Sequence, residues 1–213
     1  MQVPAARSIL ETLDNMEETK QKFIADLLSQ PVDLLASIWI IDRIPVIFDQ
    51  DIKAYANWRR VLASGLGVDA SALLITGSAA FGISLNPYKN YKFFDDSSDI
   101  DVAVVSDYHF MEGWRTLRNM GANLYTMPQN VKQSIDDHVK RYIYWGTIAT
   151  DKLLYLLPYG KQWTETIGKV SQITPTIGRT INVRIYKDLN SLRAYHVNNL
   201  KNLKTTEITR DIN

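Results

Sequence analysis

Three short runs with strand-like patterns interrupt a chain that otherwise has helical periodicity. Residues 72–76 are apolar and end in Gly77-Ser78, and residues 99–105 are rich in valine and isoleucine. Residues 180–186 alternate between apolar and polar side chains, as expected for a strand with one buried face. A small β-sheet is therefore the frame around which the rest of the chain must pack.

The remaining segments place apolar residues at the three- and four-residue spacing of helices. We expect helices over residues 5–29, 32–42, from 49 or 51 to 65 or 67, 107–120, 129–157 with a bend near Gly146, 161–172 and 189–204. The sequence thus predicts an α+β fold in one unit over residues 1–213, with a helical N-terminal extension in residues 1–66 and a core in residues 67–213.

Composition excludes several classes of function. The chain has no cysteine, which rules out disulfides, thiol nucleophiles and thiolate zinc sites and suits a reducing compartment. Charges throughout the first thirty residues argue against a signal peptide, and the most apolar run, residues 34–48, is interrupted and too short to span a membrane. We therefore expect a cytoplasmic protein without a membrane partner. Lys and Arg (24) nearly balance Asp and Glu (23), which argues mildly against long nucleic acids as partners.

Two features around the first two strands point to chemistry. Gly77-Ser78 follows a strand, where a glycine lets backbone amides and the serine hydroxyl approach a phosphate closely. Asp99 and Asp101 are separated by one residue on a strand, so their side chains point to the same face and can share hard divalent cations. Either feature alone is common; together and in this order they predict a nucleotide site that holds Mg²⁺ or Mn²⁺.

The combination resembles the polymerase-beta-like nucleotidyltransferase superfamily, in which a Gly-Ser turn precedes an acidic-hydrophobic-acidic strand. The resemblance covers residues 72–105 and, more loosely, 180–187. It implies a mixed sheet with helices on one face and transfer of a nucleoside monophosphate from a nucleoside triphosphate, such as ATP, to a hydroxyl. Asp99 and Asp101 would bind the metal ions, and Gly77 and Ser78 the terminal phosphates. Lys152 would reach the triphosphate by a looser analogy, with a surface lysine as the alternative.

Two departures from the family pattern matter. Twenty residues separate Ser78 from Asp99, and this long insertion contains a basic and aromatic stretch that could contact a base or a phosphate, or form a surface flap. The second departure is the third carboxylate that active members carry on a later strand. The polar face of residues 180–186 offers only Asn182, Arg184 and Tyr186. Arg184 could bind a phosphate oxygen, and Asp188 could be the third acid or could cap the last helix.

Several functions stay open at this level. The acceptor could be a nucleotide, a protein side chain, an RNA end or a small molecule, and the resemblance to small stand-alone bacterial members suggests a role in bacterial defence or a toxin-antitoxin system. The alternative is a catalytically inactive module of the same fold that binds a nucleotide or a protein. The helices of residues 5–66 could belong to the fold or dock a protein partner.

Overall fold

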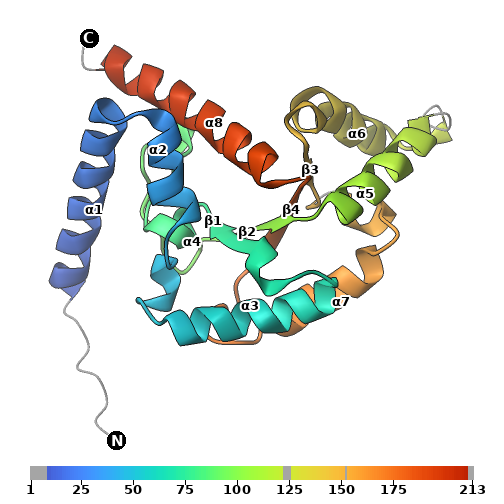
Figure 1. The fold of residues 1–213 in the computed structure, drawn as a ribbon, viewed down its shortest axis with the longest axis horizontal. Coiled ribbons are helices and arrows are strands. Elements are labelled where there is room, and N and C mark those ends of the chain that lie inside the picture. The colour runs from blue at the N-terminus through green and yellow to red at the C-terminus, as the bar shows by residue number, and fades with distance from the viewer. Residues whose placement is uncertain (1–8, 122–125, 152, 211–213) are drawn as a thin grey trace, which may run out of the picture.

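A computed structural model describes the chain except for residues 1–8, 122–125, 152 and 211–213 (Figure 1). Its centre is a four-stranded sheet in the order β1-β2-β4-β3. The strands are β1 (Leu73–Thr76), β2 (Ile100–Val105), β3 (Thr147–Ala149) and β4 (Ile181–Tyr186). β2 and β4 are parallel, whereas β1 and β3 run antiparallel to their neighbours. The prediction of an α+β fold with a small mixed sheet is confirmed.

Strand alternation divides the sheet into an apolar face and a polar face. Ile75, Val102 and Val183 are buried in the main core on the apolar face. Helices α3 (Ile52–Leu66) and α7 (Gly160–Val170) lie side by side there and contribute Trp58 and Trp163 to the same core (Figure 1). Because each indole N–H finds an acceptor, these large side chains are buried without an unpaired donor.

The polar face of the sheet is covered mainly by α8 (Leu189–Arg210), which crosses on the opposite side from α3 and α7 (Figure 1). A small second core of Ala103, Tyr186 and Leu192 joins the sheet to the first turns of this helix. Farther along α8, Leu200 and Leu203 are buried in the main core, and polar residues beside them, such as Asn199 and Asn202, line a cavity. The helix therefore stands over the polar face without filling the space above it, and the candidate site lies in that space.

The helices of residues 9–36 pack against α8, near the end of the chain. In α1 (Ile9–Ser29), Phe23 and Leu27 are fully buried. Arg193 of α8 donates to Ser37 Oγ at 2.7 Å, just beyond α2 (Val32–Ala36). The apolar stripe of α1 is thus used within the fold. Among the described residues, no helix combines the length and apolar composition needed to cross a bilayer.

Most predicted helices are present, but the long helix predicted over residues 129–157 is wrong. The chain forms α5 (Asp107–Met120) as expected, then α6 (Gln129–Arg141), and then enters strand β3. Gly146 adopts a left-handed backbone (φ 65°) that ends the helical path, and Thr147 Oγ1 donates to the Ile185 carbonyl at 2.8 Å. Three residues are too few to show a strand period, so only pairing with β4 makes this segment a strand.

Candidate functional site

A cavity of about 870 Å³ lies between the polar face of the sheet, α8 and the insertion after Ser78. That volume is within the range of small-molecule sites. Its polar lining comes from all four strands or their ends, from the insertion and from one stripe of α8. Its polar side chains include Thr76, Ser78, Tyr88, Lys89, Asp101, Asp151, Asn182, Arg184, Tyr195, His196, Asn199, Asn202, Thr206 and Arg210.

Gly77 at the end of β1 allows the Asp101 carboxylate to lie against the turn. Its backbone (φ 66°, ψ −161°) is in a region reserved for glycine, and a Cβ built there would be 2.5 Å from Asp101 Oδ2. The following helix α4 (Ser78–Phe81) has only four residues, so its dipole contributes little. What the turn supplies is close backbone approach to the Asp101 carboxylate, with Ser78 lining the same cavity.

Asp101 lies in the middle of a row of polar residues across the sheet. It pairs with Thr76 of β1 on one side and with Asn182 of β4 on the other. Although its side chain keeps solvent access from the cavity, protein surrounds it. Burial raises its pKa, Asp99 adds to the rise, and the positive charge of Arg184 opposes it. The ionised carboxylate is therefore poorly compensated by the protein, which is the condition under which a bound cation is most favourable.

Asp99 lies immediately before β2 and is exposed, and it is not among the residues that line the cavity. Asn182 Nδ2 donates to Asp99 Oδ2 at 3.4 Å, so this amide stands between the two aspartates. Two carboxylates and an amide are hard oxygen donors of the kind that Mg²⁺ and Mn²⁺ accept. Asp99, Asp101 and Asn182 therefore fit one divalent cation by donor chemistry. No group of three His, Asp or Glu side chains within the described ranges is close enough to hold a metal ion.

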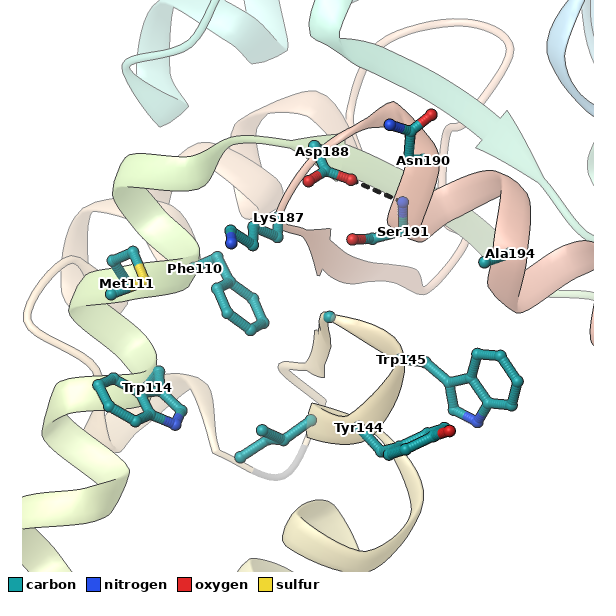
Figure 2. Close-up of a pocket in the computed structure, with 12 residues that line it drawn as sticks. Phe110, Met111, Trp114, Tyr144, Trp145, Lys187, Asp188, Asn190, Ser191 and Ala194 are labelled. Carbon is teal, nitrogen blue, oxygen red and sulfur yellow. Dashed lines mark hydrogen bonds between the residues drawn. The ribbon is translucent and has the colours of Figure 1, made fainter.

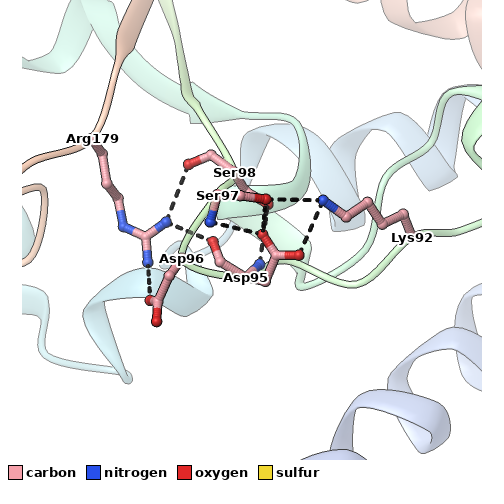
Figure 3. A network of polar contacts seen from close by, with 6 residues as sticks. All are labelled: Lys92, Asp95, Asp96, Ser97, Ser98 and Arg179. Atoms are coloured by element: carbon pink, nitrogen blue, oxygen red, sulfur yellow. Dashed lines mark hydrogen bonds and ion pairs between the residues drawn. The ribbon is translucent and has the colours of Figure 1, made fainter.

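The turn that leads into Asp99 is held by Arg179 (Figure 3). The Arg179 guanidinium donates to the carbonyls of Asp95 (2.6 Å) and Ser98 (3.1 Å) and pairs with the Asp96 carboxylate (3.0 Å). Asp95 accepts hydrogen bonds from Ser97 and Ser98 and pairs with a lysine, and these bonds hold its pKa well below the usual range. This network sets where the chain enters β2.

We expect Arg179→Met to lower the free energy of unfolding by about 2 kcal/mol, because it removes a charged donor from two carbonyls of a tight turn. The matched control is Arg115→Met. Arg115 forms one exposed ion pair with Glu112 at 3.0 Å, so its loss should cost less than about 0.5 kcal/mol. Urea unfolding of the two variants measures the difference, and equal losses would show that the turn does not depend on Arg179.

Arg184 lies two residues after Asn182 on β4, and two aromatic rings hold its side chain in place. Its guanidinium lies 4.8 Å from the Tyr142 ring centroid and 5.0 Å from that of Tyr195, and it donates to Tyr195 Oη at 2.5 Å. Such contacts fix a cation in place without neutralising it. Nearby, burial and then the charge of Arg184 lower the pKa of His196 to about 4, so this ring is neutral at pH 7. The cavity thus has a rigid positive charge beside Asp101.

The fold does not bring Asp188 close to Asp99 and Asp101. Its Oδ1 accepts from the backbone N–H of Ser191 at 2.6 Å, a bond that lowers its pKa and caps the start of α8. It lines a different pocket of about 550 Å³, between aromatic side chains such as Phe110 and Trp145 (Figure 2). Of the two roles open to Asp188, the structure has it as a helix cap. Lys152 lies outside the described residues.

The insertion reaches the cavity instead of standing apart from it. Its segment Asn86–Lys89 lines the cavity, and Arg210 of α8 donates to the Pro87 carbonyl and to Asn90 Oδ1, both at 3.4 Å. Tyr88 is 97% exposed at the rim, and the charge of Lys89 acts on Asp101 from this side. The loop is therefore held by α8 and presents one cation to the cavity.

Other lining residues were missed by sequence reasoning. Asp151 was assigned to a helix, although it follows β3 and lines the cavity. Along α8, the lining side chains recur every three or four residues, which is the spacing of one helix face. They are Tyr195, Asn199, Asn202, Thr206 and Arg210, and His196, Leu200 and Leu203 line the cavity beside this face. The sequence contains this spacing, but no local sequence feature shows that this face of α8, and not another, lies toward the sheet.

No protein-family model, curated protein or solved structure matches this chain. A function can therefore be inferred only from the residues and the geometry of the cavity.

Proposed function

We propose that this chain is a metal-dependent nucleotidyltransferase that transfers a nucleoside monophosphate from a nucleoside triphosphate to a hydroxyl acceptor. The observation that carries the proposal is that one cavity combines the Gly77 turn, the Asp101 carboxylate and the fixed Arg184 cation. Asp101 and Asp99 would hold Mg²⁺ or Mn²⁺, which when bound neutralises phosphate charge and lowers the pKa of an attacking hydroxyl.

The residues of the cavity would divide the remaining work. Gly77 and Ser78 offer a backbone amide and a hydroxyl to the phosphates, and Arg184 and Lys89 offer positive charge from two sides. The acceptor oxygen forms a bond to the α-phosphorus, the bond between that phosphorus and the β-phosphate bridging oxygen breaks, and pyrophosphate leaves. The amides and hydroxyls of the α8 stripe lie on the opposite wall, where they can hydrogen-bond to the base or the sugar.

The second candidate is a module that binds a nucleotide without turnover. It is favoured by a specific observation: β4 presents Asn182 and Arg184 on the cavity side, where the resembled family carries an acid. Both candidates use the same residues for binding, so only a chemical assay separates them.

The test is incubation with each of the four α-labelled nucleoside triphosphates and Mg²⁺ or Mn²⁺. We expect transfer of label and release of pyrophosphate by the wild type and by Asp188→Asn, and neither by the double variant Asp99→Ala, Asp101→Ala. The size of the labelled product distinguishes a nucleotide, a protein, an RNA end and a small molecule as acceptor, and a protein or nucleotide product bears on a role in bacterial defence. Metal-dependent binding without any transfer would favour the binding module, and no binding would reject both.

A further inference from the structure

The Arg184 guanidinium is a fixed cation in the wall of the cavity that lacks a carboxylate partner. None of the ion pairs among the described residues includes it. It contacts the rings of Tyr142 and Tyr195 and the Tyr195 hydroxyl, and Asp101 acts on it only at a distance. Tyr142 lies on the β3 side of the sheet, where its carbonyl accepts from the Thr147 N–H at 3.2 Å. A partly buried cation with these neighbours keeps its charge for an anion in the cavity.

Tyr195 adds a second donor at the same place. Its Oη accepts a hydrogen bond from Arg184 Nη1, so its own hydrogen must point to another acceptor. Among the described residues, no acceptor for that hydrogen is in place, and both side chains line the cavity. The tyrosine hydroxyl and the remaining guanidinium N–H groups together form a set of donors for the oxygens of one phosphate or carboxylate group.

Strand register places this donor pair on the far side of Asp101 from the Gly77 turn. Thr76, which precedes the turn, is opposite Asp101 on β1, and Gly77 follows it toward the start of β2. Arg184 is on β4, level with Ala103, which is two residues closer to the end of β2 than Asp101 is. Two strand spacings and three residues thus separate Gly77 from Arg184, which is about 14 Å between their α-carbons.

The transfer that we propose gives the two ends of this diagonal different roles. A triphosphate held at Gly77 and Ser78 has its leaving pyrophosphate on that side and its α-phosphorus beside Asp101. The attacking and leaving oxygens must be roughly in line through the phosphorus. The acceptor hydroxyl therefore approaches from the Arg184 side, where the donors for an anionic group are in place.

We propose that the acceptor is a small hydroxyl compound that carries a phosphate or carboxylate group, and that Arg184 and Tyr195 bind this group. The inference rests on the proposed function. The oxygen of the acceptor hydroxyl bonds to the α-phosphorus, the bond from that phosphorus to pyrophosphate breaks, and the hydroxyl proton leaves to solvent. The near balance of charges in the whole chain argues against a long nucleic acid as the source of the anionic group.

The test is calorimetric titration of inorganic phosphate, and separately of acetate, into protein saturated with Mg²⁺ and the α,β-methylene nucleoside triphosphate that binds best. We expect the wild type to bind a further anion although the triphosphate site is filled, and the anion that binds identifies the group. Arg184→Met should weaken this binding by about tenfold or more, and Tyr195→Phe, which removes only a hydroxyl, by about fivefold. Affinity for the triphosphate analogue should stay near the wild-type value in both variants.

The matched control is Arg118→Met. The Arg118 guanidinium also lies over an aromatic ring, 4.5 Å from the Trp114 centroid, but Arg118 does not line the cavity. Its substitution should leave the affinities for the anion and for the analogue unchanged. Urea unfolding curves of Arg184→Met and Tyr195→Phe that match the wild type show that loss of the anion site is not loss of the fold.

Three results would contradict the assignment in distinguishable ways. If the saturating analogue abolishes anion binding, or if Arg184→Met weakens binding of the analogue as much as that of the anion, Arg184 serves the triphosphate and the nucleotidyltransferase proposal stands without an anionic acceptor. The same conclusion follows if the wild type binds neither phosphate nor acetate. If the wild type binds none of the four analogues, the proposed function is rejected, and the acceptor role of Arg184 with it.

Discussion

Gly77→Ala should lower the free energy of unfolding by about 3 kcal/mol or more and abolish metal-dependent nucleotide binding. An alanine at this position would have to keep a backbone (φ 66°, ψ −161°) that only glycine adopts without strain, which costs about 1–3 kcal/mol. Its Cβ would also be 2.5 Å from Asp101 Oδ2. Because β1 and β2 are paired at this point, the two backbones keep their positions and the Asp101 carboxylate would have to rotate away from the turn. Urea unfolding and binding of a triphosphate analogue measure the two effects.

The matched control is Gly67→Ala. Gly67 also has a positive φ (70°), at the end of α3, but no atom lies within 4 Å of a Cβ built there. Its substitution should lower the free energy of unfolding by about 1 kcal/mol, because of the left-handed backbone alone, and leave nucleotide binding unchanged. A double-mutant cycle of Gly77→Ala with Asp101→Ala isolates the contact with the carboxylate. If Gly77→Ala and Gly67→Ala lose the same stability, the close approach to Asp101 has no energetic consequence.

Asp101→Asn should make the metal-free protein more stable at pH 7 while reducing metal affinity by about 100-fold or more. The pKa of Asp101 is raised, first by burial, so the folded chain disfavours the ionised carboxylate that is present at neutral pH. Asparagine has the same shape without the charge. Loss of a metal ligand, in contrast, removes more affinity than the roughly 10- to 100-fold that loss of a supporting residue costs. Stability and metal binding are therefore expected to change in opposite directions.

The pH dependence gives this prediction a signed test. A carboxyl group whose pKa is higher in the folded than in the unfolded state binds a proton more tightly when folded. The stability of the wild type relative to Asp101→Asn should fall as pH rises from the ordinary aspartate pKa of 3.8 through the raised pKa, and then stay level. Urea unfolding of both proteins without metal, between pH 3 and pH 8, measures it. A constant difference across this range would contradict the raised pKa.

Asp188→Asn is the comparison for the same substitution at a different site. The hydrogen bond from Ser191 lowers the pKa of Asp188, so removal of the Asp188 charge should slightly destabilise the chain. The loss should be small because asparagine is also a good helix cap. Metal and nucleotide binding should stay at the wild-type level because Asp188 lines the other pocket. A loss of metal binding in Asp188→Asn would return this residue to the site.

Local patterns predicted β1, β2 and β4 and the polarity of their faces correctly, but not β3. β2 and β4 have enough residues to show a period of two, and their alternation put Asp101 on one face and Asn182 and Arg184 on the polar face of β4. The glycine at position 77 was expected to permit close approach, although the group that comes close in the structure is the Asp101 carboxylate. These features depend on backbone sterics and on neighbours within a few residues, which the sequence contains.

The composition of the cavity was decided by tertiary structure. β3 exists because three residues find hydrogen-bond partners on β4, and Asp151, two residues after this strand, lines the same cavity as Asp101. Likewise, the direction in which α8 leaves the sheet has two consequences. Asp188 caps the start of the helix, and the helix face that contains Asn199 lies toward the cavity. Strand order and helix direction are set by which apolar faces bury each other, and this depends on residues far apart in the chain. The sequence by itself determined the aspartate pair and the turn before it, and the tertiary structure alone decided which side chains surround them.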